Sequence, residues 1–144
     1  MIFLLDTCVV SEFIKPEPSA SLVQWLRSTD DLQMAISVIT LGEIQAGISR
    51  LDDGKRKERY QEWLSYELIP RFDGRILPVL LDDAMKWGDL LGWARVKGTP
   101  LPSTDTLIAA TALNHHMTVV TRNTKDFERI GVLTLNPWLG AAAE

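Results

Sequence analysis

The chain has 144 residues, 46% of them hydrophobic, and a formal net charge of −4. This length predicts a single compact domain over residues 1–140 with a frayed tail over residues 141–144, and it leaves no room for a second domain. No apolar stretch approaches the ~20 residues of a membrane helix, so we expect a cytoplasmic protein that does not enter the membrane.

The net charge bears on nucleic-acid binding, and the cysteine content bears on disulfide bonds. The negative net charge argues against attraction of nucleic acid by the whole surface, although local basic clusters can still provide it. The only cysteine, Cys8, cannot form an internal disulfide. We expect it to be a small core residue without a chemical role.

Short apolar runs alternate with segments of helical periodicity along the chain. In chain order, the pattern predicts a strand over residues 2–5, helices over 9–14 and 19–26, a strand over 34–36, helices over 37–51 and 55–68, a strand over 75–79, helices over 80–98 and 103–116, and strands over 118–121 and 133–135. Short buried strands that alternate with helices indicate an α/β fold. In this fold class a parallel sheet is covered on both faces and has right-handed crossovers.

Acidic and amide side chains gather near the ends of the predicted strands. Asp6 follows the first strand, and Glu43 lies one turn into the helix after the second. Asp105 opens the helix before the fourth strand, and Asn123 and Asp126 come after that strand. Because catalytic groups of open parallel sheets collect beyond the carboxyl ends of the strands, we expect these side chains to converge.

Crowded carboxylates repel one another unless a cation neutralises them. An all-oxygen set without cysteine or paired histidine ligands suits Mg²⁺ or Mn²⁺. Such a site can hold phosphate groups and activate water for in-line attack. The pattern therefore predicts a hard-metal site that acts on phosphate esters.

Each of these acids also has a purely structural explanation, which the sequence leaves open. Asp6 or Thr7 can cap the first helix, and Glu43 can complete a capping box with Thr40. Asp105 can interact favourably with the dipole of the helix that it opens. Asp126 can interact in the same way with the dipole of a helix capped by Thr124.

Four segments in this order and spacing resemble a PIN domain of the VapC toxin type, in its FitB-like branch. They are LLDTCVVSE, TLGEIQAGI, LPSTDTLIAATA and VVTRNTKDF with the following LTLNPW. The resemblance implies a three-layer α/β/α sandwich around a mainly parallel sheet of about five strands. It also implies a Mg²⁺- or Mn²⁺-dependent endoribonuclease that cleaves RNA and is the toxin of a toxin–antitoxin pair. The partners that the resemblance implies are a VapB-like antitoxin and a second copy of this chain, in a homodimer.

By position in that family, Asp6, Glu43 and Asp105 are the expected metal-binding acids. Many PIN domains place a further acid where this chain has Asn123, which can coordinate or position water but brings no charge. Asp126, one turn later, can supply that charge. Arg122 and Lys125 are close in sequence to this position and are candidates to hold substrate phosphates.

Other functions fit less well. A haloacid-dehalogenase-type phosphatase needs an aspartate where Cys8 stands, and a receiver domain needs a lysine late in the sheet, where the chain has Thr121-Arg122. The glycine spacing excludes a P-loop. The main alternative is a catalytically silent PIN-like interaction module in which the acids only cap helices.

Overall fold

The computed structural model describes residues 1–139, and the predicted tail over 141–144 lies outside them. The strands form one five-stranded sheet in the order β3-β2-β1-β4-β5, and every neighbouring pair is parallel. The strands are β1 Phe3–Leu5, β2 Met34–Ser37, β3 Ile76–Leu77, β4 Thr118–Val120 and β5 Thr134–Leu135.

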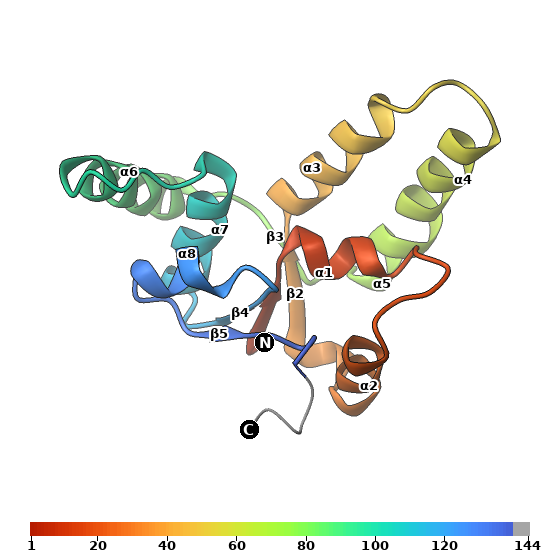
Figure 1. The fold of residues 1–144 in the computed structure, drawn as a ribbon, viewed down its shortest axis with the longest axis horizontal. Coiled ribbons are helices and arrows are strands. Elements are labelled where there is room, and N and C mark those ends of the chain that lie inside the picture. The colour runs from red at the N-terminus through yellow and green to blue at the C-terminus, as the bar shows by residue number, and fades with distance from the viewer. Residues whose placement is uncertain (140–144) are drawn as a thin grey trace.

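Helices connect the strands and cover both faces of the sheet, as Figure 1 shows. They are α1 Thr7–Glu12, α2 Ala20–Ser28, α3 Val38–Ser49, α4 Lys55–Trp63, α5 Ile69–Arg71, α6 Leu81–Val96, α7 Ser103–Asn114 and α8 Thr124–Arg129, with a 3₁₀ turn η1 Asp31–Gln33 and a π-helical turn η2 Leu64–Leu68. Within residues 1–139, no helix is long and apolar enough to cross a bilayer.

Two hydrophobic cores make this a three-layer α/β/α sandwich, as predicted. Successive side chains of a strand point to opposite faces, so Leu5 and Val120 enter one core while Leu4 and Val119 enter the other. The first core packs against α1, α2, α4 and η2, and the second against α7 and α8. Figure 1 shows α6, α7 and α8 on one side of the sheet, and α1, α2, α4 and α5 on the other.

The position of β1 in the sheet determines where a site can form. The chain runs from β1 outward through β2 to β3 and then returns to place β4 on the other side of β1. The order of the strands therefore reverses between β1 and β4, which is the point where open α/β sheets bind ligands beyond their carboxyl ends. The pairing continues to this edge, because the Asp6 N–H donates to the Val120 carbonyl at 2.9 Å.

Some predicted element boundaries were wrong. The charged helix predicted over 55–68 does not end there, because the π-helical turn η2 carries it into α5 and on to Arg71. The third strand is only Ile76–Leu77, since Pro78 follows and a proline has no N–H for the sheet. The N-cap of α8 is Asn123 and not Thr124, because Thr124 already belongs to the helix.

Candidate active site

Asp6 lies at the centre of the switch point, directly after β1. Its side chain is 6% exposed. Asp6 Oδ1 accepts a hydrogen bond from the Thr7 N–H at 2.8 Å, which caps α1, and Oδ2 accepts one from the Thr121 hydroxyl at 2.8 Å. The capping explanation is thus confirmed, and the same carboxylate also lies in the cleft at the carboxyl edge of the sheet.

Thr121 is a site residue that the sequence analysis did not single out. It is fully buried at the end of β4, and besides donating to Asp6 its hydroxyl accepts the Asn123 N–H at 3.0 Å. One hydroxyl therefore links the residue after β1 to the loop after β4. Its position at the predicted carboxyl edge was the only signal in the sequence that could have identified it.

Glu43 reaches the site from α3. The N-cap of α3 is Ser37, whose hydroxyl accepts the Ile39 N–H at 3.0 Å, so Glu43 lies beyond the first turn. The predicted capping box with Thr40 is therefore wrong. Instead, the Thr7 hydroxyl donates to Glu43 Oε1 at 2.6 Å, which ties the start of α1 to α3. Thr7 is the second residue whose contribution to the site the sequence analysis missed.

Asp105 stands in the first turn of α7 and is half-buried. Burial disfavours its charged form, and the negative charges of Asp6, Glu43 and Asp126 add to this effect, so the pKa of Asp105 rises to about 6. The predicted acids are therefore close enough to repel one another. An acid in the first turn also suits the dipole of α7, so that explanation stays open.

Asn123 and Asp126 form a separate group on α8. The Asn123 amide donates to Asp126 Oδ2 at 3.2 Å, and Arg129 Nη1 contacts Asp126 Oδ1 at 3.3 Å. Arg129 offsets part of the Asp126 charge, whereas Asp105 forms no ion pair within residues 1–139. Asp126 is thus a weaker source of negative charge at the site than its position in the sequence indicates.

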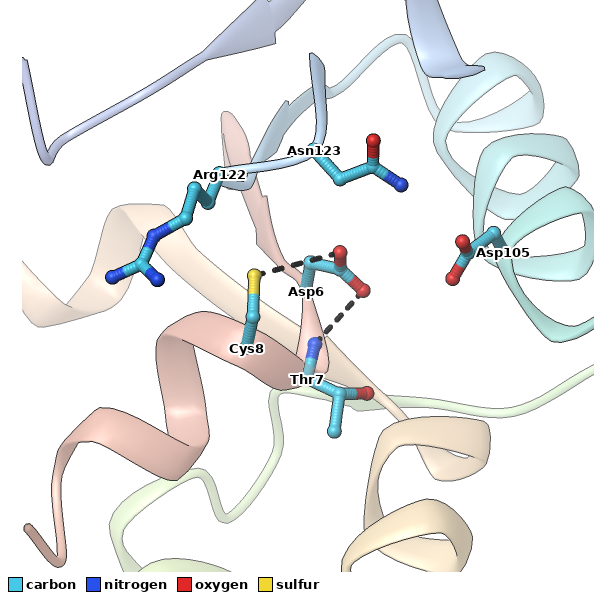
Figure 2. Close-up of a pocket in the computed structure, with 6 residues that line it drawn as sticks. All are labelled: Asp6, Thr7, Cys8, Asp105, Arg122 and Asn123. Carbon is cyan, nitrogen blue, oxygen red and sulfur yellow. Dashed lines mark hydrogen bonds between the residues drawn. The ribbon is translucent and has the colours of Figure 1, made fainter. Parts of the chain in front are cut away.

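An open cleft of about 480 Å³ runs between β1, β4 and α7. Figure 2 shows that Asp105 faces Asp6 and Asn123 across it, while the Arg122 guanidinium points away from these side chains. The residues that line the cleft are Asp6, Thr7, Cys8, Asp105, Arg122 and Asn123. The cleft thus joins three of the predicted site residues with Arg122, and the other predicted residues lie outside its lining.

Cys8 lines the cleft, whereas Lys125 does not. Cys8 packs against the core as expected, but it also lines the cleft, with Sγ 3.7 Å from Asp6 Oδ2 and 3.6 Å from the Thr121 hydroxyl. Burial, followed by the Asp6 charge, raises the pKa of this thiol above its ordinary value despite an opposing backbone hydrogen bond, so it stays protonated at neutral pH. Lys125 is exposed on α8 and does not line the cleft.

The donor set fits a hard divalent cation. Carboxylate and amide oxygens line the cleft. A cation bound there would favour the charged form of Asp105, which burial and then the neighbouring acids disfavour. As the side chains stand, no three His, Cys, Asp or Glu residues between 1 and 139 are gathered tightly enough to hold one ion. Metal binding here would therefore require these side chains to move toward the cation.

Comparison with known proteins shows relatives that match almost the whole chain. "VapC ribonuclease Y4jK" of Sinorhizobium fredii is 36% identical over 135 residues, which cover 94% of this chain and 96% of that protein. "Toxin FitB" of Neisseria gonorrhoeae is 38% identical over 135 residues, covering 94% and 97%.

Solved structures agree with these relatives. FitAcB from Neisseria gonorrhoeae has a TM-score of 0.88 at 37% identity and covers 95% of this chain and 99% of that one. VapBC2 from Rickettsia felis, bound to a DNA fragment from its promoter, has a TM-score of 0.75 at 29% identity, with 94% and 98% covered. The PIN domain model matches residues 3–133, and PIN nucleases generally depend on a divalent metal. With the predicted acids around the same edge of a parallel sheet, this chain belongs to the PIN-domain family.

Proposed function

We propose that this protein is an endoribonuclease that depends on Mg²⁺ or Mn²⁺ and acts as the toxin of a toxin–antitoxin pair. The observation that carries the proposal is the cleft at the switch point of the sheet, where Asp105 faces Asp6 and Asn123. Burial, and then the negative charges of Asp6, Glu43 and Asp126, raise the pKa of the Asp105 carboxyl to about 6. A chain that only needed helix caps would have no reason to place these four acids within electrostatic reach of one another.

In this proposal Asp6, Glu43 and Asp105 hold the cation, and Asn123 with Asp126 complete the catalytic group. A divalent cation bound there supplies the charge that helps water to lose its proton and that offsets the negative phosphate. Thr121 and Thr7 keep Asp6 and Glu43 in place through hydrogen bonds of 2.8 and 2.6 Å. Asn123 supplies an amide that can orient water without adding repulsion.

The partners follow from the relatives and from the surface. The matching structures of FitAB and VapBC are toxin–antitoxin complexes, which supports a VapB-like antitoxin for this chain. Exposed apolar side chains recur at helical spacing on α6, which supports a homodimer. They are Leu81, Met85, Trp93 and Val96. An RNA substrate and a protein antitoxin meet in the cytoplasm, where we propose that the protein acts.

The test is cleavage of RNA by purified protein with Mg²⁺, with Mn²⁺ and with excess chelator. Wild type should cleave only with metal and leave 3′-hydroxyl and 5′-phosphate ends, whereas Asp6→Asn should lose almost all activity. Asp73→Asn is the matched control, because Asp73 is an exposed acid that precedes β3 and lies outside the cleft. Undiminished cleavage in chelator would rule out the mechanism, and no cleavage under any condition would favour the silent interaction module.

A further inference from the structure

The side chain of Arg122 starts at the cleft and ends on an aromatic ring. Its guanidinium carbon lies 4.2 Å from the centroid of the Trp138 ring. The backbone N–H of Trp138 donates to Asn136 Oδ1 at 3.0 Å, and the Trp138 side chain packs against the first core. A short turn after β5 thus fixes the ring on which Arg122 lies.

The Arg122 guanidinium lies over the Trp138 ring. A guanidinium held over an aromatic ring in this way can keep its five N–H donors for other partners. Within the part of the chain that the structure describes, the Arg122 side chain makes no hydrogen bond and no ion pair. Trp138 Nε1 is buried and has no hydrogen-bond partner among residues 1–139. The ring therefore acts as a support for the guanidinium and not as a hydrogen-bond donor.

Glu12, an acid whose pKa Arg122 affects, already has other partners. Glu12 Oε1 accepts the Ser19 N–H at 3.2 Å, and Glu12 Oε2 lies 2.7 Å from Lys15 Nζ. Burial acts to raise the pKa of Glu12, but Lys15, Ser19 and Arg122 together hold it below its ordinary value. Glu12 therefore stays charged and attracts Arg122 electrostatically, but within residues 1–139 it forms no ion pair with the guanidinium.

A polyanion that approaches the acids needs a cation next to them. Arg122 is the only basic residue in the lining of the cleft, and it belongs to the same loop as Asn123. A guanidinium with free edges binds a phosphate through two parallel hydrogen bonds, and the aromatic support reduces the side-chain freedom that such binding removes.

We propose that Trp138 holds Arg122 ready to bind a backbone phosphate of the RNA next to the phosphate that is cleaved. This inference rests on the proposed function and adds a phosphate subsite to it. Arg122 contacts the substrate in this arrangement, and Trp138 is a positioning residue that acts through Arg122.

The first experiment measures binding of a single-stranded oligoribonucleotide by fluorescence anisotropy in chelator, where cleavage is stopped. Arg122→Gln should raise Kd about tenfold, the size expected for one charge-assisted contact. It should also reduce the slope of log Kd against log salt by about 0.7, the value for one phosphate on a single strand. Arg122→Lys keeps the charge but lacks the planar guanidinium, so its Kd should lie between those of wild type and Arg122→Gln.

Arg27→Gln is the matched control for charge, because Arg27 is exposed near the end of α2, the helix that leads to the amino end of β2. It removes the same charge far from the cleft and should leave Kd within about twofold of wild type, as expected for a distant exposed charge. If Arg122→Gln and Arg27→Gln give the same Kd, the phosphate subsite does not exist.

The second experiment tests Trp138 through kinetics with Mg²⁺. Arg122→Gln should raise KM about tenfold with little change in kcat, because Arg122 contacts a neighbouring phosphate and not the one that is cleaved. Trp138→Leu should raise KM severalfold, and Trp138→Phe should stay near wild type, since a phenyl face still supports a guanidinium. In the double variant with Arg122→Gln, Trp138→Leu should add no further increase in KM.

These outcomes separate this inference from the proposed function. If the Trp138→Leu effect persists undiminished in the Arg122→Gln background, Trp138 has only a structural role and the positioning claim fails. If wild type does not cleave RNA with metal, the ribonuclease proposal fails, while the anisotropy comparison still decides whether Arg122 binds phosphate. Arg122 is exposed, so its variants test the subsite without a risk to folding.

Discussion

The Thr121 hydroxyl donates to Asp6 Oδ2 at 2.8 Å although 115 residues of chain separate them. This hydrogen bond joins the ends of β1 and β4 and fixes the orientation of a carboxylate that is 6% exposed. Because Thr121 also accepts the Asn123 N–H at 3.0 Å, the position of Asn123 depends on the same hydroxyl. Four predictions follow this geometry from the buried acids to the loop after β4.

Replacing Thr121 by valine keeps the shape of the side chain and removes the donor. The buried Asp6 carboxylate then lacks one partner, so the free energy of unfolding should fall by about 1 to 3 kcal/mol. Urea denaturation measures it. Thr118→Val is the control, because Thr118 is at the amino end of the same strand. Equal stability of the two variants would show that the Thr121 hydrogen bond does not hold Asp6.

The stability of the metal-free protein should depend on pH through Asp105. The pKa of this carboxyl is about 6 in the folded chain and about 3.8 in its ordinary state, so between these values the folded chain binds more protons than the unfolded chain. Its contribution is therefore intact below about pH 4 and is lost as the pH rises through 6. Since Asp105 is half-buried and water screens its charge, we expect the free energy of unfolding to fall by about 1 kcal/mol as the pH rises through this range.

Urea denaturation in chelator from pH 4 to 8 measures this loss. Asp105→Asn should remove it, so the variant should gain stability relative to wild type as the pH rises. Curves that stay parallel over the whole range would mean that Asp105 does not experience the charges of Asp6 and Glu43.

The third prediction concerns Mg²⁺ and Asp105. In chelator at pH 7, Asp105→Asn should melt at the same temperature as wild type or higher, because it removes repulsion. It should also lose most of the increase in Tm that Mg²⁺ gives wild type, since a ligand stabilises only the state that binds it. A variant that melts lower in chelator and keeps the full Mg²⁺ shift would identify Asp105 as a helix-dipole residue.

The fourth prediction adds the acid that position 123 lacks. Asn123→Asp would place a carboxylate 3.2 Å from Asp126 Oδ2, where the amide now donates a hydrogen bond. The metal-free protein should lose about 1 kcal/mol of stability, and Mg²⁺ should bind severalfold more tightly by calorimetry. Asn123→Ser is the control for loss of the amide alone. Unchanged Mg²⁺ affinity in Asn123→Asp would exclude position 123 from the metal site.

Much of the fold could be predicted from the sequence because each strand is a short apolar run. Runs such as Ile2 to Leu5 are apolar on both faces, as strands buried under helices must be, and the strand ends then predict the edge where acids meet. The first five residues thus placed Asp6 correctly. Boundaries set by a local backbone detail, such as the π-helical turn at Leu64–Leu68, have no comparable pattern and were missed.

The parts of the site that the sequence did not reveal depend on contacts between distant segments. Nothing near Thr121 in the sequence indicates that its hydroxyl faces Asp6, and nothing near Trp138 indicates that it lies under Arg122. Glu43 matched a capping-box pattern, yet the true cap at Ser37 moved it beyond the first turn and left it free to meet Thr7. Spacing alone cannot decide between such alternatives, because both use the same residue types.

The place of β1 between β2 and β4 has a consequence for biosynthesis. A growing chain that has exposed only β1, β2 and β3 lacks one side of the central strand, and Asp6 has no Thr121 to hold it. Asp105 and Asp126 come after β3 in the chain, so the group of acids is complete only once α7, β4 and α8 have been synthesised. Incomplete chains that stop before β4 should therefore be harmless to cellular RNA.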